Sequence, residues 1–209
     1  MKTLGQLVIA VCGNAFGLAL MLKTDLGASA WGAATSNLSL FFGWSEGLSI
    51  IIISVGFYLI AILIQRRFIW FDALLSLAFL LAFGSLLDVF LRWLPALHDI
   101  AIGWRILWNV IGMLVLLFSI ALHLHIKIAV HPLDVYMQAL QQRFKQVAVG
   151  TYLTYGSAFV IAILFGLLHG EIADIGIGTI LIVLFGGVIM NGYEKWVFRF
   201  GKEEGNVLD

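Results

Sequence analysis

The best candidates for functional side chains are single carboxylates that lie in apolar segments of the sequence. Asp88 lies within an apolar run and Arg92 follows four residues later, so a helix would place both on one face and permit an ion pair. A carboxylate inside an apolar helix is costly unless it is partnered or faces water, which makes Asp88 equally a candidate for proton coupling. The sequence leaves both interpretations open.

Two further aspartates are expected where apolar helices begin. Asp72 opens one apolar run and Asp174 stands just before another, where a carboxylate can cap a helix and complement its dipole. Their positions differ by 102 residues (174 − 72), a spacing that recurs along the chain. Capping is the first expectation, and a paired site between two halves of the protein is the alternative.

Three histidines lie close together in sequence, at His123, His125 and His131. Neighbours two apart point to different faces of a helix, whereas zinc-binding pairs on a helix are spaced by about four residues. The single Cys12 is distant in sequence, so we predict neither a metal site nor a cofactor. The histidines are expected near the membrane surface, with a pH-sensitive gate as the alternative.

The remaining polar residues give weaker signals. Asn14 and Asn191 are candidates for solute binding, although an amide is easily satisfied against a neighbouring helix. The chain contains no G-x-S-x-G elbow, no H-E-x-x-H helix and no glycine loop followed by Lys-Ser or Lys-Thr. We therefore do not expect an enzyme or an ATP-driven pump.

The composition places all these residues in a membrane protein. Hydrophobic residues make up 62% of the chain and charged residues 11%, and the mean hydropathy is +1.04. Globular domains are roughly half apolar and a quarter charged. A formal net charge of zero offers no concentrated basic surface for nucleic acid. The expected fold class is an all-α membrane protein whose main partner is the lipid bilayer.

Apolar runs predict six transmembrane helices, and tryptophans near several of their ends are typical of membrane interfaces. The runs cover roughly residues 4–22, 47–65, 71–92, 105–126, 148–168 and 176–198. With the N-terminus inside, only three of the twelve Lys and Arg residues fall outside, namely Lys23, Arg92 and Arg105. This bias predicts that both termini are cytoplasmic.

The first run also resembles a cleavable signal, because Lys2 precedes it and Ala28-Ser29-Ala30 follows it. It is longer than the about 7 to 15 apolar residues usual in a signal, and its pattern returns later in the chain. We therefore predict a retained span.

A shift of 102 residues superposes the first half of the chain on the second. It places Phe83-Gly84 on Phe185-Gly186, as well as Asp72 on Asp174. Three spans in each half is an odd number, so the second half would enter the membrane from the opposite side, as an inverted repeat. We predict residues 1–102 and 103–200 as two repeats of one membrane domain, and 201–209 as a polar cytoplasmic tail.

Each half carries a short helix after its first span, predicted at residues 28–42 and 131–144. The shift sets Ser29-Ala30-Trp31-Gly32 against His131-Pro132-Leu133-Asp134. Pro132 disfavours helix at His131, and Asp134 is expected to cap the helix that follows. The first expectation is an amphipathic helix lying flat at the interface. The alternative is a re-entrant helix whose N-terminus binds an anion or a substrate carboxylate, with Trp31, His131 and Asp134 as site residues.

The small residues of the first span, the two turns just described and the final helix GIGTILIVLFGGVIMNGY together resemble the YczE/YyaS/YitT group of bacterial membrane proteins. The resemblance covers nearly the whole chain. The first copy departs from the group's pattern, since Ala30 and Gly32 stand where proline and aspartate are expected. The resemblance implies a multi-pass protein of the bacterial inner membrane and supplies no substrate.

Glycine pairs predict where helices approach closely. Gly13-x3-Gly17 lies in the first span and Gly166-x3-Gly170 in the fifth. We expect both pairs to pack inside the bundle, and a homodimer is the alternative.

The inverted repeat favours a secondary transporter or permease that moves a small solute by alternating access. The first alternative is the substrate-binding membrane subunit of a larger uptake system, which would need ATPase partners. The second is a scaffold or regulatory protein that contacts another membrane protein through its helices.

Overall fold

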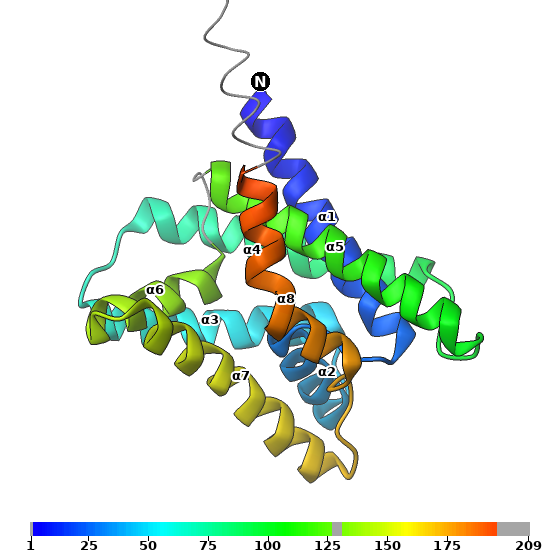
Figure 1. Ribbon diagram of the computed structural model, residues 1–209. Helices are drawn as coiled ribbons and strands as arrows, with labels where there is room; N and C mark the ends of the chain where they lie inside the picture. Colours follow the sequence, from blue (N-terminus) through cyan, green and yellow to red (C-terminus); the bar gives the residue numbers. More distant parts are fainter. Residues whose placement is uncertain (1, 127–130, 196–209) are drawn as a thin grey trace, which may run out of the picture.

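The computed structural model describes residues 2–126 and 131–195, and every regular element in these ranges is a helix (Figure 1). The helices are α1 (Lys2–Thr24), α2 (Ala30–Phe42), α3 (Glu46–Gln65), α4 (Trp70–Trp93), α5 (Ile102–Ile126), α6 (Pro132–Phe144), α7 (Val147–His169) and α8 (Ile177–Tyr193).

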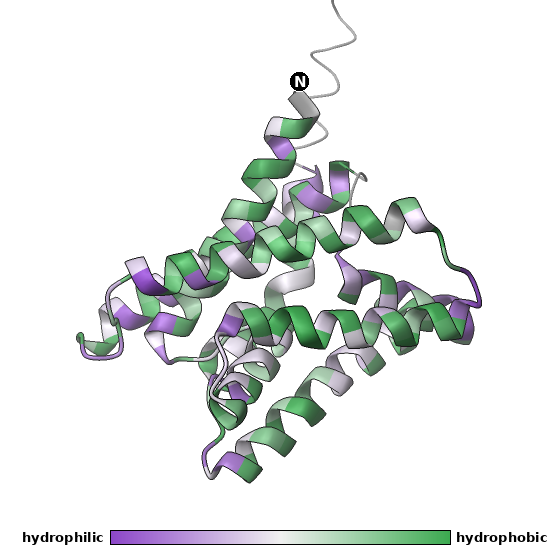
Figure 2. Ribbon diagram, turned by 180° about the vertical axis from the view of Figure 1, so that it is seen from behind, coloured by the Kyte–Doolittle hydropathy of each residue, from purple (hydrophilic) through white to green (hydrophobic). Residues whose placement is uncertain are grey.

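Five of the helices in the described ranges are long and apolar enough to cross a membrane, namely α1, α3, α4, α5 and α7. The predicted sixth span coincides with α8, which is apolar but has only 17 residues. A full crossing takes about 20 residues. The predicted end of this span and the predicted tail, beyond residue 195, lie outside the described residues. Hydrophobic residues run along the helices, and hydrophilic ones gather at their ends and connections (Figure 2).

The helices form two groups. α1 packs against α5 and α4, while α2, α3, α6 and α7 pack together in the second group (Figure 1). Contacts between α3 and α4 join the groups, and α8 packs mainly against α5. The core is built largely from small residues on α1 and α2 with larger side chains from α4 and α5.

The two short helices have the same length and pack crosswise in space. α2 and α6 each have 13 residues, and they begin 102 residues apart (132 − 30). Each ends in a left-handed residue, Gly43 and Lys145, again 102 apart (145 − 43). The short helix of the first half, α2, packs on α7 of the second half, and α6 packs on α3 of the first. Each short helix thus lies against a long helix of the other half.

Glycines allow a close contact between α1 and α5. A Cβ on Gly17 would lie 2.6 Å from the Leu116 nitrogen and 2.7 Å from the Gly112 oxygen. A Cβ on Gly13 would collide with Ser119. The expectation that this pair packs inside the bundle is confirmed. In the second pair, Gly166 faces Asn37 and Ile172, while Gly170 ends α7 in a left-handed conformation.

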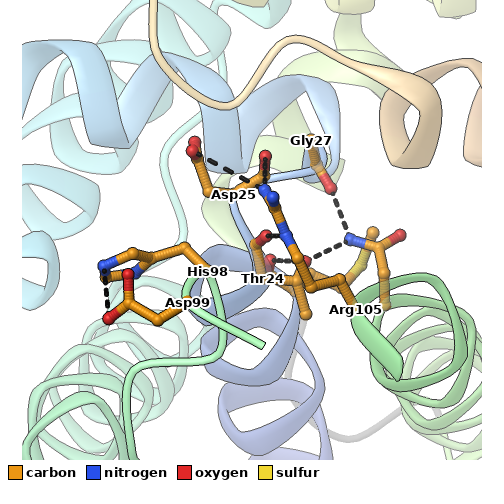
Figure 3. Close-up of polar contacts among 8 residues, drawn as sticks. Thr24, Asp25, Gly27, His98, Asp99 and Arg105 are labelled. Carbon is orange, nitrogen blue, oxygen red and sulfur yellow. Dashed lines mark hydrogen bonds and ion pairs between the residues drawn. The ribbon is translucent and has the colours of Figure 1, made fainter. Parts of the chain in front are cut away.

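Side chains of α5 hold the C-terminal end of α1 (Figure 3). Arg105 donates from Nε to the main-chain oxygen of Thr24 at 3.0 Å and from Nη2 to the main-chain oxygen of Asp25 at 3.1 Å. A cation is favoured here because the last carbonyls of a helix carry partial negative charge. Asn109, 2% exposed, donates to Thr24 Oγ1 and to the Gly27 oxygen, both at 2.9 Å. This network fixes the turn from α1 into α2.

Asn109→Ala should lower the free energy of unfolding by about 2 kcal/mol, because it leaves buried polar groups on Thr24 and Gly27 without their donor. Denaturant titration of the purified protein in detergent would measure the change. An unchanged unfolding midpoint would mean that water replaces the amide at this turn.

Candidate functional site

The short helix α2 is an interior element. Nine of its 13 residues are buried, including the polar residues Thr35, Ser36 and Asn37. Its exposed positions are the apolar residues Leu40, Phe41 and Phe42. An interfacial helix would show the reverse, with its polar face in water. The expectation that the first short helix lies flat at the surface is therefore wrong.

Small residues allow this burial. Ser29 caps α2 by accepting a hydrogen bond from the Gly32 nitrogen at 3.1 Å. Ala33 and Ala34 are 0% exposed, and a Cβ on Gly32 would lie 2.7 Å from a Leu18 methyl carbon. The glycine that replaces the expected aspartate thus leaves room for the Leu18 side chain of α1. Trp31 packs edge-on against Phe57 of α3, with ring centroids 4.9 Å apart.

Ser36 brings two carboxyl groups from distant parts of the chain together. Its hydroxyl donates to Asp174 Oδ2 at 2.6 Å, which joins α2 to the connection between α7 and α8. The same hydroxyl lies beside the Glu46 carboxyl group, at the start of α3. Glu46 Oε2 and Asp174 Oδ1 are buried and have no hydrogen-bond partner. We call Ser36, Glu46 and Asp174 the carboxyl site.

Asn37 holds the connection that carries Asp174. The side chain is 0% exposed, donates to the Ala33 and Ala173 oxygens at 2.8 Å each, and accepts from the Ala173 nitrogen at 2.9 Å. The Ala28 nitrogen also donates to the Asp174 main-chain oxygen at 3.0 Å. Asp174 itself has a positive φ of 57°, a conformation that aspartate tolerates better than most residues. These bonds fix the carboxyl group beside Ser36.

Asp88 lies next to the carboxyl site and ties α4 to the start of α3. Its Oδ1 accepts from the Gly47 nitrogen at 2.8 Å and its Oδ2 accepts from Ser45 Oγ at 2.6 Å. Because Gly47 is in the first turn of α3, Asp88 satisfies a free N–H and complements the helix dipole. The ion pairs among the described residues include none between Asp88 and Arg92. Of the two interpretations that the sequence left open for Asp88, the structure does not support the ion pair with Arg92, because the carboxylate turns toward α3.

Within the described parts of the chain, the carboxyl site has no basic partner. The ion pairs of the described residues involve neither Glu46 nor Asp174, and the nearby Arg105 lies 3.9 Å from Asp25. Burial raises the pKa of Asp174 to about 6; the hydrogen bond from Ser36 opposes this rise, and the charge of Asp25 adds to it. A carboxyl group with this pKa gains or loses a proton near neutral pH.

Neither aspartate of the predicted pair occupies the cap position of its helix. The cap residue of α4 is Ile69 and that of α8 is Gly176, while Asp174 reaches across to α2. Asp72 lies in the first turn of α4, and its side chain is outside the described part of the structure. The 16 residues from Asp72 to Asp88 span about 24 Å along a helix axis. Asp72 is thus at the opposite end of α4 from the carboxyl site.

A second polar group surrounds the start of α6. His131 has extended backbone, as Pro132 predicts, and its Nδ1 accepts from the Leu133 nitrogen at 3.2 Å. Asp134 was the expected cap, but it stands in the first turn and His131 occupies the cap position. The His131 ring lies edge-on to Phe79 and Phe83, with centroids 5.6 and 5.7 Å away.

Burial favours the uncharged forms of both Asp134 and His131. It raises the pKa of Asp134 to about 7. It lowers the pKa of His131 to about 3, and the neighbouring His123 adds to that shift. α6 buries only one face, formed by Pro132, Leu133, Tyr136, Ala139 and Leu140, which agrees with the amphipathic helix expected here.

Sequence reasoning missed the residues at the centre of the carboxyl site, Ser36, Asn37 and Glu46. The available signal was the run Thr35-Ser36-Asn37 in an otherwise apolar segment, together with a carboxylate opening a long apolar helix. Of the other candidates, Asn14 is buried on α1, whereas Asn191 is exposed on α8. Among the described residues, no group of three or more His, Cys, Asp or Glu could hold a metal ion.

Five apolar helices of spanning length, with buried polar groups gathered on short helices between them, define a multi-pass helical membrane protein. The chain belongs to a family of unknown function, DUF6198, whose family model matches residues 1–195. No curated protein and no solved structure matches the chain. The likeness to the YczE/YyaS/YitT group stays a prediction.

Proposed function

We propose that this protein is a secondary transporter that moves a small solute across a bacterial inner membrane. The observation that supports it best is the crosswise packing of the short helices, since α2 lies on α7 and α6 lies on α3. α2 carries buried polar side chains into this contact between the halves. Relative movement of the halves would therefore alter the surroundings of the carboxyl site, as alternating access requires.

In this proposal α8 completes six spans, and the halves are inverted repeats with both termini in the cytoplasm. The common length of α2 and α6 and their 102-residue spacing support the repeat. α2 is then a re-entrant helix, because its polar residues are satisfied inside the protein, where irregular backbone at membrane depth is tolerated. The carboxyl site lies toward the outer side, since the ends of α2 and α7 both lead to outer connections.

Thermal stability of the purified protein, measured against a panel of amines, amino acids, vitamins and inorganic ions, tests for a solute site. A ligand that binds only the folded state stabilises it by about 2.7 kcal/mol at about a hundredfold excess over its Kd. We expect the Tm shift to be lost in Ser36→Ala and kept in Ser85→Ala, a control at an exposed serine of α4. Uptake of that compound into liposomes would then test transport.

Two results would reject the transporter. A compound that binds but crosses the membrane only after nucleotide-binding subunits are added would identify a subunit of a larger uptake system. If no compound shifts the Tm and another membrane protein is found bound to α7 or α8, the result would favour a scaffold.

A further inference from the structure

We propose that Glu46 and Asp174 bind one proton between them and that this proton is the coupling ion of the protein. The coupling role rests on the proposed function, whereas the proton site rests on the geometry of the carboxyl site alone. The proton comes from solvent and converts one of the two carboxylates to a carboxylic acid.

The hydroxyl of Ser36 cannot satisfy two carboxylates. It has one hydrogen, and it donates that hydrogen to Asp174 Oδ2 at 2.6 Å. The Glu46 carboxyl beside it can then only interact with the lone pairs of the hydroxyl, for which it needs a hydrogen of its own. A protonated Glu46 supplies that hydrogen, so a single proton completes the chain of hydrogen bonds.

Two buried oxygens give an independent sign that something is bound here. Glu46 Oε2 and Asp174 Oδ1 are both buried and have no hydrogen-bond partner. A buried carboxylate oxygen without a partner is unfavourable, because it loses its hydration and gains nothing in return. Protonation removes the charge from one group and with it much of this cost.

The charges around the pair have the sign that favours a proton. α4 contributes Asp88 and the turn after α1 contributes Asp25, both acidic. α2 contributes no ionisable side chain. Arg105 of α5 bonds to the main-chain oxygens of Thr24 and Asp25 and pairs with the Asp25 carboxylate at 3.9 Å, so its charge offsets that of Asp25 and is not directed at Glu46 or Asp174. Two close carboxylates without a cation share a proton in preference to ionising together.

The pair also bridges the two halves. Glu46 begins α3 of the first half, and Asp174 precedes α8 of the second. A movement that separates the halves would part the two carboxyl groups and expose them to water, where each ionises. Proton release would thus be linked to that movement, as a proton-coupled transporter requires.

The test is the Tm of the purified protein across pH about 8 to about 5, for the wild type, Glu46→Gln, Asp174→Asn and the control Glu171→Gln. A carboxyl whose folded-state pKa exceeds its unfolded value binds a proton more tightly when folded. The wild-type Tm should therefore rise as the pH falls through about 6. Glu46→Gln and Asp174→Asn should each raise the Tm at pH about 8 and remove about half or more of the rise toward low pH.

Glu171 is exposed in the same connection, so Glu171→Gln should leave the profile unchanged. As a second measurement, the infrared difference spectrum of the wild type minus Glu46→Gln at pH about 6 should show the carbonyl stretch of a protonated carboxylic acid, because the contribution of Asp134 is common to both proteins and cancels. A difference spectrum without that band, or variants that lose Tm at every pH with an unchanged slope, would overturn the proposal. Stabilisation by sodium at constant pH, lost in both variants, would replace the proton by a sodium ion.

These outcomes differ from failure of the proposed function. If the protein shows the band and the pH profile but moves no solute in liposomes, the proton site is supported and the transporter proposal is rejected. If solute uptake is independent of the pH gradient, the transporter proposal is supported and the coupling role of the proton is rejected.

Discussion

Gly17→Ala is expected to destabilise the protein by about 3 kcal/mol or more, one of the largest effects of a single methyl group in this chain. The new Cβ would lie 2.6 Å from the Leu116 nitrogen, 2.7 Å from the Gly112 oxygen and 2.9 Å from the Leu116 Cα. All three atoms belong to the backbone of α5, which cannot rotate away as a side chain can. α1 and α5 must therefore separate, and the packing on both sides of Gly17 is lost.

The matched control is Gly5→Ala in the same helix, where a Cβ meets nothing within 4 Å. Alanine is favoured over glycine inside a helix by about 1 kcal/mol, so this variant should be as stable as the wild type or slightly more stable. Denaturant titration and the yield of folded protein in detergent measure both. Equal stability of the two variants would show that α1 and α5 are not in contact at Gly17.

Asn37→Leu should have a comparable effect and should also disable the carboxyl site. Leucine has a similar size but leaves the Ala33 oxygen without its side-chain donor and both the Ala173 oxygen and nitrogen without partners. Each buried polar group left unsatisfied costs about 1 to 3 kcal/mol. Because Ala173 holds the neighbouring Asp174 beside Ser36, we also expect the pH dependence of the Tm to fall sharply.

Asn191→Leu makes the same chemical change at an exposed position of α8 and is the control. It should leave both the Tm and its pH dependence near the wild-type values. If Asn37→Leu proved as stable as Asn191→Leu, the connection between α7 and α8 would not be anchored by α2. A destabilised Asn37→Leu with an intact pH profile would instead mean that Asp174 is held in place without Asn37.

The sequence by itself determined the local structure of most of the chain. The five long spans, the two short helices and the break at His131-Pro132 follow from apolar runs, proline and turn residues that act within a few positions. The tight packing of Gly13 and Gly17 was also predictable, because small residues are placed where helices approach. The predicted start of the first short helix at residue 28 differs from the observed Ala30 because Ser29 supplies its cap.

Only the tertiary structure decided which polar residues meet. Ser36 and Asp174 are 138 residues apart, and no local pattern states that the connection before α8 lies on α2. The spacing of four residues permitted an ion pair between Asp88 and Arg92, but the start of α3 offers Asp88 a free backbone N–H and the Ser45 hydroxyl. α2 was expected at the interface because short helices often are, yet its small residues let neighbouring helices cover it on nearly all sides. The backbone sets the spacing of side chains within a helix. Contacts between helices depend on how all the helices pack together, so they are a property of the whole fold.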